Sequence, residues 1–171
     1  MIAARPADRN DVPALVELGS SSFWSAYGGT ASDEDIAAHI EKYFSAGAIQ
    51  EQMSLPYVTY LIAHEGDGFS GFAKIREGDP HACIEADTAI EVQQLYVSPD
   101  FQRRGVGGIL MDSTVDRARQ HGVDGVWLSV WSGADWAVAF YEKYGFVKKG
   151  TDDFHLGKEV HLDHIMWLTV D

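Results

Sequence analysis

The chain has 171 residues, of which 46% are hydrophobic and 12% aromatic, and its formal net charge is −13. This composition provides an apolar core and excludes an intrinsically disordered chain. The negative charge disfavours nucleic acid and anionic membrane surfaces as partners, because both are bound through basic patches. The same charge would attract small cations, although it could also serve solubility alone.

The length of 171 residues fits a single domain over residues 1–171. A domain of this size buries about two thirds of the surface of its unfolded chain. The single cysteine, Cys83, leaves no disulfide framework and fits a reducing compartment. No apolar run approaches the length of a membrane span, and the N-terminus lacks the pattern of a signal peptide. We therefore expect a cytoplasmic protein.

The first half of the chain combines helical and extended patterns. A short strand, Ile2–Arg5, precedes a helix that ends before Gly28, where consecutive glycines break it. Ser32 can cap a second helix that reaches about Phe44. A third short helix is expected over Ala48–Met53, and a hairpin is expected over Tyr57–His64 and Phe69–Arg76.

The second half of the chain predicts a mixed sheet. Thr88–Val97 has the residue types of a long strand, and a helix follows over Gly105–Gln120. The later elements are a strand over Val126–Trp131, a helix over Asp135–Tyr144, and a hairpin of Phe146–Leu156 and Val160–Val170. This order has a meander first and one crossover helix. We therefore expect an α+β fold whose sheet is mostly antiparallel, with one parallel pair near its middle.

The stretch Glu91–Gln120 contains the most informative pattern, a strand followed by a glycine-rich loop and a helix. Three of the four residues Gly105–Gly108 lack a Cβ atom, so a phosphate could approach the free N–H groups of the helix N-terminus. An anion there would also neutralise Arg103 and Arg104. The spacing fits neither the dinucleotide fingerprint nor a P-loop, which indicates a different diphosphate. The alternative is a solvated basic loop with a tight turn.

Two separated motifs carry a resemblance to a known family. The segment Gln102–Gly108 matches the Gln/Arg-x-x-Gly-x-Gly/Ala signature of the GNAT superfamily of acetyl-CoA-dependent N-acetyltransferases, and Ala137–Phe146 resembles its Ala-x-x-Phe-Tyr-x-Lys-x-Gly-Phe segment. The opening, Ile2–Leu18, is similar to the family's first strand and helix. The resemblance implies the acyl-CoA N-acyltransferase fold, an α/β three-layer arrangement of about seven strands and about four helices. It also implies acetyl-CoA as co-substrate and direct transfer to an amine.

The resemblance assigns roles to individual residues. Glu91 matches a glutamate that activates the amine through water, since an amine with a pKa of about 10.4 must lose a proton before it attacks. Tyr141 matches the acid that protonates the leaving thiolate. Each has a structural alternative, because Glu91 could lie on a solvated strand face and Tyr141 could be part of a packed helix face. The cofactor contacts implied are Leu95, Tyr96, Val97, Gln102, Arg103, Arg104, Gly105, Val106, Gly107, Gly108 and Trp136. Ala134 departs from the family, since many relatives carry an asparagine there that holds the pantetheine arm.

The acceptor amine is the least determined part of the prediction. The segment that forms part of the acceptor pocket in relatives combines aromatic and acidic residues, which suit an alkylammonium ion through cation–π contacts of about 0.5 to 2 kcal/mol. These residues are Phe23, Trp24, Tyr27, Glu34 and Asp35. The alternative is that the aromatic residues belong to the core and the acids to the solvated surface.

The run Trp127–Trp131 and the chain length resemble bacterial polyamine acetyltransferases of the PaiA type, so a small-molecule amine such as a polyamine is the favoured acceptor. A protein N-terminus or lysine as acceptor, a non-catalytic acyl-CoA sensor, and a homodimer stay open. No metal is expected, because His161 and His164 point to opposite faces of a strand.

Overall fold

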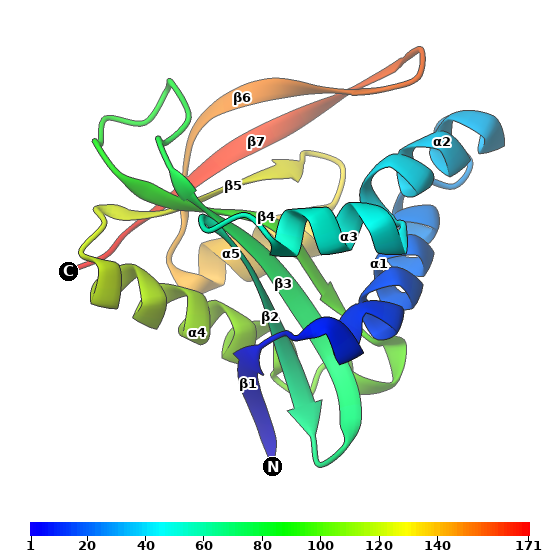
Figure 1. The fold of residues 1–171 in the computed structure, drawn as a ribbon. Coiled ribbons are helices and arrows are strands. Elements are labelled where there is room, and N and C mark those ends of the chain that lie inside the picture. Colours follow the sequence, from blue (N-terminus) through cyan, green and yellow to red (C-terminus); the bar gives the residue numbers. More distant parts are fainter.

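The computed structural model describes residues 1–171 as one seven-stranded sheet covered by helices (Figure 1). The strands are β1 (Ile2–Pro6), β2 (Val58–Glu65), β3 (Gly68–Gly78), β4 (Ala89–Val97), β5 (Gly125–Trp131), β6 (Val147–Leu156) and β7 (Glu159–Thr169). The helices are α1 (Val12–Tyr27), α2 (Asp33–Phe44), α3 (Ala46–Met53), α4 (Val106–His121) and α5 (Asp135–Tyr144), with short 3₁₀ helices η1 (Arg9–Asp11) and η2 (Pro99–Phe101). No helix combines the length and the hydropathy that a membrane-spanning segment requires.

The strand order is β1-β2-β3-β4-β5-β7-β6. Every neighbouring pair is antiparallel except β4 and β5, which run parallel because α4 connects them as a crossover. The expected mixed sheet with one central parallel pair is therefore confirmed. β7 lies between β5 and β6, so the C-terminal hairpin joins the sheet through its second strand.

The apolar side chains divide between the two faces of the sheet. On one face, Leu110 and other residues of α4, together with Val138 of α5, pack against Ile90 and its neighbours on the central strands. On the other face, Leu15 of α1 and Ile49 of α3 pack against β2 and β3, and α2 continues this layer toward β6. Figure 1 shows α1, α2 and α3 grouped together, away from α4. The α+β, three-layer arrangement expected from the sequence is present.

Local signals in the sequence explain where the helices begin. The Asp8 side chain accepts a hydrogen bond from the Asn10 N–H at 2.7 Å, and the Asp8 N–H donates to the Asp11 carboxylate at 2.7 Å. This reciprocal capping box starts η1, which leads directly into α1. Ser32 Oγ accepts from the Asp35 N–H at 3.1 Å and caps α2 as expected.

The central strand is irregular at one residue. Lys74 of β3 pairs with Gln94 and Ile75 pairs with Val92, so Gln93 is an extra residue, a β-bulge. The bulge changes which side chains face α4: Val92 packs on the α4 face before it, and Leu95 does so after it. A strand without the bulge would alternate these residues onto opposite faces.

The parallel ladder between β4 and β5 is short. It pairs Ala89–Val92 with Gly125–Leu128 and then ends. Residues 94–97 of β4 keep their partners on β3, whereas none of residues 93–97 has a partner on β5. The two strands therefore diverge, and the β5-facing backbone edge of residues 93–97 is left open next to the glycine-rich loop.

Candidate active site

The loop between β4 and α4 leaves the N-terminus of α4 free. Gly105 is the N-cap residue, in a left-handed conformation with φ +82°, and it has no side chain to cap the helix. The N–H groups of the first turn of an α-helix have no partner within the helix. The loop therefore presents unpaired donors at the positive end of the helix dipole, which suits an anion such as phosphate.

The three glycines of this loop do different things. Gly105 allows the left-handed turn. A Cβ atom at Gly107 would lie 3.2 Å from Phe140 Cζ, so this glycine permits α4 and α5 to approach closely. A Cβ atom at Gly108 would meet nothing within 4 Å. Gly107 therefore also serves helix packing, a role beyond the ligand approach predicted from the sequence.

The two arginines of the loop are also not equivalent. The Arg104 guanidinium donates to the Glu65 carboxylate at 2.8 Å and lies 4.8 Å from the centre of the Phe101 ring. Arg103, at φ +60°, forms no ion pair and is exposed. Arg103 is therefore the loop cation that is free to meet an anion, while Arg104 ties the loop to the end of β2.

Tyr141 lies where α5 packs on the sheet. Its ring contacts Phe140 and Phe146, with ring centres 5.2 and 5.7 Å apart, and it packs against the core under α4. Its hydroxyl makes no hydrogen bond to the protein, and burial raises the pKa of Tyr141 well above its usual value. The phenol therefore stays protonated at neutral pH and can donate a proton.

Tyr96 brings the two layers together at the diverging strands. Burial raises the pKa of Tyr96, and the nearby hydroxyls of Tyr27 and Tyr141 raise it further. Tyr27 belongs to α1 on one face of the sheet, and Tyr141 belongs to α5 on the other. The three phenols therefore meet close to the opening between β4 and β5.

Glu91 lies on β4 two residues before the bulge, on the opposite face from α4. The Gln93 side-chain amide donates to its carboxylate at 3.0 Å. Burial lowers the pKa of the neighbouring Lys74, and the Glu91 charge opposes that shift, so the two side chains are close. Glu91 is partly exposed, which leaves it accessible to water or to an amine.

The remaining predicted residues differ in how far their side chains are exposed. Trp136 is 82% exposed on the first turn of α5, near the N-terminus of that helix. Phe23 is buried and stacks on His39 at a centroid distance of 4.1 Å, so it is part of the core beneath α2. Trp24 is partly exposed on α1. Glu34 lies in the first turn of α2.

Asp35 and Tyr27 connect the helical layer to the C-terminal hairpin. The Asp35 carboxylate lies against Gly157 in the turn between β6 and β7. The Tyr27 ring packs against Trp131 and Phe154, with ring centres 6.1 and 5.4 Å apart. The structure thus places Tyr27 next to aromatic residues of β5 and β6 that the sequence-based site did not include.

The sequence-based site also missed a set of polar residues on the same sheet face. Ser129, His161 and Asp163 belong to β5 and β7, and the Ser129 hydroxyl donates to Asp163 Oδ2 at 2.7 Å. The signal was present in the sequence, because Trp127, Ser129 and Trp131 alternate with buried apolar residues. No group of three or more His, Cys, Asp or Glu residues is arranged to hold a metal ion.

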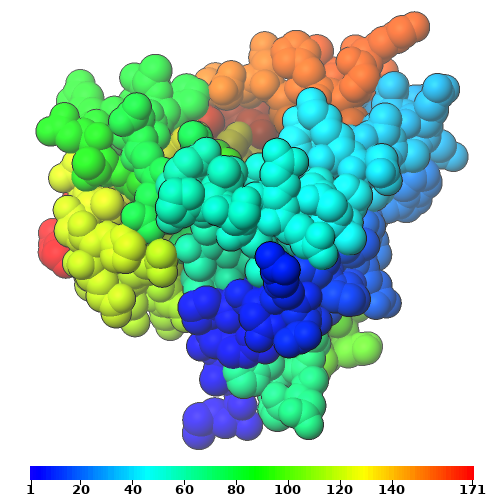
Figure 2. All heavy atoms as spheres, viewed as in Figure 1, coloured from blue at the N-terminus to red at the C-terminus, as the bar shows by residue number.

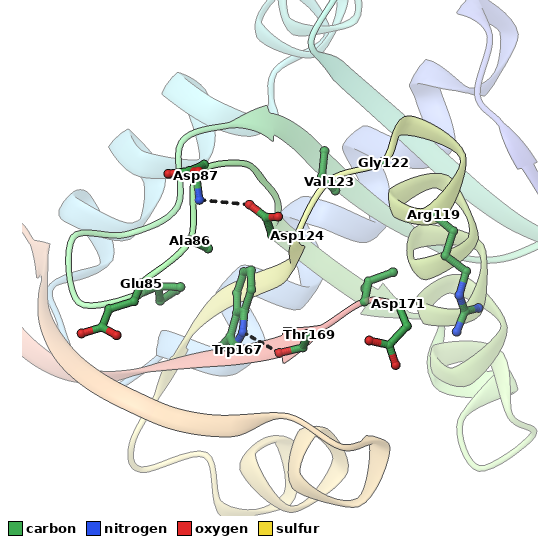
Figure 3. A pocket seen from close by; sticks show the side chains of 12 residues that line it. Glu85, Ala86, Asp87, Arg119, Gly122, Val123, Asp124, Trp167, Thr169 and Asp171 are labelled. Carbon is green, nitrogen blue, oxygen red and sulfur yellow. Dashed lines mark hydrogen bonds between the residues drawn. The ribbon is translucent and has the colours of Figure 1, made fainter.

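A large cavity lies elsewhere. It has a volume of about 910 Å³ and is lined by residues of the β3–β4 loop, the C-terminal end of α4 and the end of the chain (Figure 3). Within it, the Asp124 carboxylate accepts the N–H groups of Asp87 and Thr88 at 3.0 and 2.9 Å. This cavity is at the opposite end of α4 from the glycine-rich loop, about 24 Å away at 1.5 Å per residue. It is therefore separate from the site built around the diverging strands.

Comparison with known proteins identifies a family. The model of the acetyltransferase (GNAT) family matches residues 21–146. An N-acetyltransferase of Mycobacterium tuberculosis, described as uncharacterised, is 28% identical over 156 residues, which cover 91% of this chain and 96% of that protein. The [ribosomal protein bS18]-alanine N-acetyltransferase of Escherichia coli is 29% identical over 118 residues, covering 67% of this chain and 75% of its own length.

Solved structures show the same fold. The PaiA N-acetyltransferase of Thermoplasma acidophilum, in complex with coenzyme A, superposes with a TM-score of 0.79 at 22% identity and covers 99% of both chains. A further acetyltransferase from Salmonella typhimurium, solved with acetyl-CoA, has a TM-score of 0.68 at 20% identity and covers all of this chain and 95% of its own. Together with the family match, these similarities establish that the chain belongs to the acetyltransferase (GNAT) family and is an acyltransferase.

Proposed function

We propose that this enzyme moves the acetyl group of acetyl-CoA directly to a primary amine of a small, positively charged molecule. The observation that carries the proposal is the opening between β4 and β5, which runs from the unpaired amides of α4 on one side to an acidic, aromatic sheet face on the other. A cofactor bound at the glycine-rich loop would place its thioester in this opening from one side, and an amine would reach the thioester from the other side.

The cofactor would be held mainly by main-chain groups. Its diphosphate suits the free amides of Val106, Gly107 and Gly108, with Arg103 as the accompanying cation. The open backbone edge of Leu95–Val97 would pair with the amides of the pantetheine arm, as an added strand does at a sheet edge. Gln102 flanks the loop, and exposed Trp136 borders the start of α5. Ala134 offers no side-chain cap there, so pantetheine would rely on the β4 backbone.

The chemistry needs one base and one acid. Glu91 would accept a proton from the ammonium group, directly or through water, because only the neutral amine attacks. The amine nitrogen forms a bond to the thioester carbon and the carbon–sulfur bond breaks. Tyr141 would give its proton to the departing thiolate, and the second proton lost by the nitrogen on amide formation would restore the Tyr141 phenol. The open amides of the bulged strand would stabilise the oxyanion that forms between these steps.

A small cationic acceptor, with polyamines as the favoured class, is supported by the charge and the lining of the site. The chain carries a net charge of −13, and the sheet face beyond the opening holds Glu91, Asp163 and several aromatic rings. The second candidate is the N-terminus of a protein, which the similarity to the bS18-alanine N-acetyltransferase favours. Phe23 would act only as a support beneath this pocket, since it is buried.

The two acceptor classes are separated by one assay. The protein is mixed with acetyl-CoA and with polyamines, amino-acid amides or short peptides that have free N-termini, and release of the CoA thiol is followed. We expect the highest kcat/KM with polyamines. Turnover of the peptides alone would overturn the small-amine proposal and select the protein acceptor.

A further inference from the structure

The sheet face opposite α4 carries a groove. Figure 2 shows a hollow between the β3–β4 loop, β6 and the helices of the α1–α3 layer, with atoms of β5 and β7 at its bottom. The loop is fixed over this face because His81 Nε2 contacts the Asp152 carboxylate on β6 at 3.1 Å and its ring lies over Trp127 on β5. The opening between β4 and β5 meets the floor of the groove.

Asp163 on β7 is the unusual residue of this floor. It is only 8% exposed, and although its Oδ2 accepts the Ser129 hydroxyl, its Oδ1 has no hydrogen-bond partner. Burial raises the pKa of Asp163, and the nearby charge of Asp152 raises it further. A buried carboxylate oxygen without a donor is costly, so the site is prepared for a group that brings both a proton donor and a positive charge.

The surroundings of Asp163 fit an organic cation. Tyr27, Trp131 and His161 form a ring cluster, with centroid distances of 6.1, 5.4 and 5.5 Å between the three pairs. Burial raises the pKa of Tyr27 to about 12, and the Asp163 charge contributes, so this cluster and the carboxylate are close. His161 Nε2 is also buried without a partner. Aromatic faces beside a carboxylate attract alkylammonium groups.

We propose that Asp163 Oδ1, with the ring cluster of Tyr27, Trp131 and His161, is a binding subsite for a second ammonium group of the acceptor. The inference rests on the proposed function and makes it more specific: the substrate carries at least two cationic nitrogens, one acetylated at the opening and one held at Asp163. Asp163 is a specificity-determining residue and takes no part in the acetyl transfer itself.

The strand register sets the spacing of the two ends. Glu91 pairs with Trp127 on β5, whereas Asp163 pairs with Trp131, four residues further along the same strand. At about 3.3 Å per residue this offset is about 13 Å along the strands. Because β4 and β7 lie on opposite sides of β5, two strand spacings of about 4.8 Å are added across the sheet, so the two Cα atoms are about 16 Å apart. The two nitrogens must therefore be joined by an extended aliphatic chain, so long diamines and polyamines fit and short diamines do not.

The test compares acceptors that differ by one charge. In the full-length protein, kcat/KM is measured with 1,8-diaminooctane, spermidine and the monoamine octylamine, using thiol release from acetyl-CoA. The wild type should prefer the di- and polyamines to octylamine by about 10- to 100-fold, the range expected for one hydrogen bond to a charged group. Asp163→Asn should remove this preference, leaving the rate with octylamine and the affinity for CoA unchanged.

Asp153→Asn is the matched control. Asp153 neighbours Asp152 on β6 and is exposed, so its replacement removes the same charge from the molecule without touching the subsite. It should keep the wild-type preference. If Asp163→Asn does not fold, the wild type still gives an answer through inhibition. A long alkyl chain with a dimethylamino group at each end is protonated at neutral pH, can donate N–H hydrogen bonds and cannot be acetylated, and it should compete with spermidine more strongly than the same chain with one dimethylamino group.

The outcomes distinguish the inference from the function beneath it. Equal kcat/KM for 1,8-diaminooctane and octylamine in the wild type, or an equal loss with both amines in Asp163→Asn, would overturn the subsite and leave the small-amine acetyltransferase in place. Absence of thiol release with every amine would overturn the proposed function and the subsite together. Equal inhibition by the mono- and diammonium ions would also count against the subsite.

Discussion

Replacing Tyr141 by phenylalanine should separate catalysis from stability. The ring contacts with Phe140 and Phe146 remain, and the hydroxyl that is lost makes no hydrogen bond to the protein. The free energy of unfolding should therefore change by less than about 0.5 kcal/mol. If the phenol protonates the leaving thiolate, kcat should fall by about 100-fold or more, the range for loss of a general acid. The dissociation constant for CoA should stay the same, since no main-chain amide of the loop is altered.

Tyr144→Phe is the control for this experiment. The Tyr144 hydroxyl, one helical turn away, donates to the Asp112 carboxylate. Its removal should cost about 1 kcal/mol of stability and leave kcat unchanged. Denaturant unfolding gives the free energy of unfolding of both variants, and steady-state kinetics give kcat of both. A wild-type kcat in Tyr141→Phe would refute the reasoning and return Tyr141 to a packing role. If kcat of the wild type falls with a pKa below about 10 and this fall is absent in Tyr141→Phe, the raised pKa of Tyr141 would be contradicted.

Three further predictions use other parts of the site. Glu91→Gln should lower the rate by about 100-fold at neutral pH. The difference from the wild type should shrink at alkaline pH, because an amine with a pKa of about 10.4 then loses its proton without a base. A pH–rate profile with a constant difference would exclude a role of Glu91 as base. Gly105→Ala should cost about 1 kcal/mol of stability, because φ at this position is +82°, and it should weaken CoA binding. Gly108→Ala should keep the wild-type stability, because the added Cβ atom would meet nothing within 4 Å. Identical unfolding curves for these two variants would contradict the assigned loop geometry. Burial lowers the pKa of His39 to about 4 from its usual 6.5, so protonation opposes folding and the stability should fall as the pH drops from 6.5 toward 4. The melting temperature of His39→Gln should fall less over that range. The same pH dependence in the variant and the wild type would argue against a buried, neutral His39.

The sequence predicted the elements well because their signals are local. The capping residues, the glycines at helix ends and the alternating strands placed the helices and strands within a few residues of their observed bounds. The insertion of β7 between β5 and β6 could not be predicted, because strand order depends on contacts between distant segments. The bulge had a signal that was not used: the apolar positions Ile90 and Val92 are followed by Leu95 and Val97, which breaks the two-residue alternation.

The site was predicted unevenly for the same physical reason. The glycine-rich loop is one contiguous stretch, so its residues stood out in the sequence. The acceptor side is assembled from α1, β5, β6 and β7, and Asp163 became conspicuous only once its burial and its unpaired oxygen were known. The different role of Gly107 was also hidden, because Phe140 lies on another helix.

The short ladder between β4 and β5 has a consequence for the evolution of the enzyme. Residues 93–97 forgo partners on one side, and each main-chain hydrogen bond contributes about 0.5 to 1.5 kcal/mol to stability. Substitutions that extend the hydrogen-bonded ladder between β4 and β5 would therefore raise the melting temperature and close the gap in which transfer occurs. Selection for heat resistance alone would favour an inactive protein, and the opening persists only where activity is selected as well.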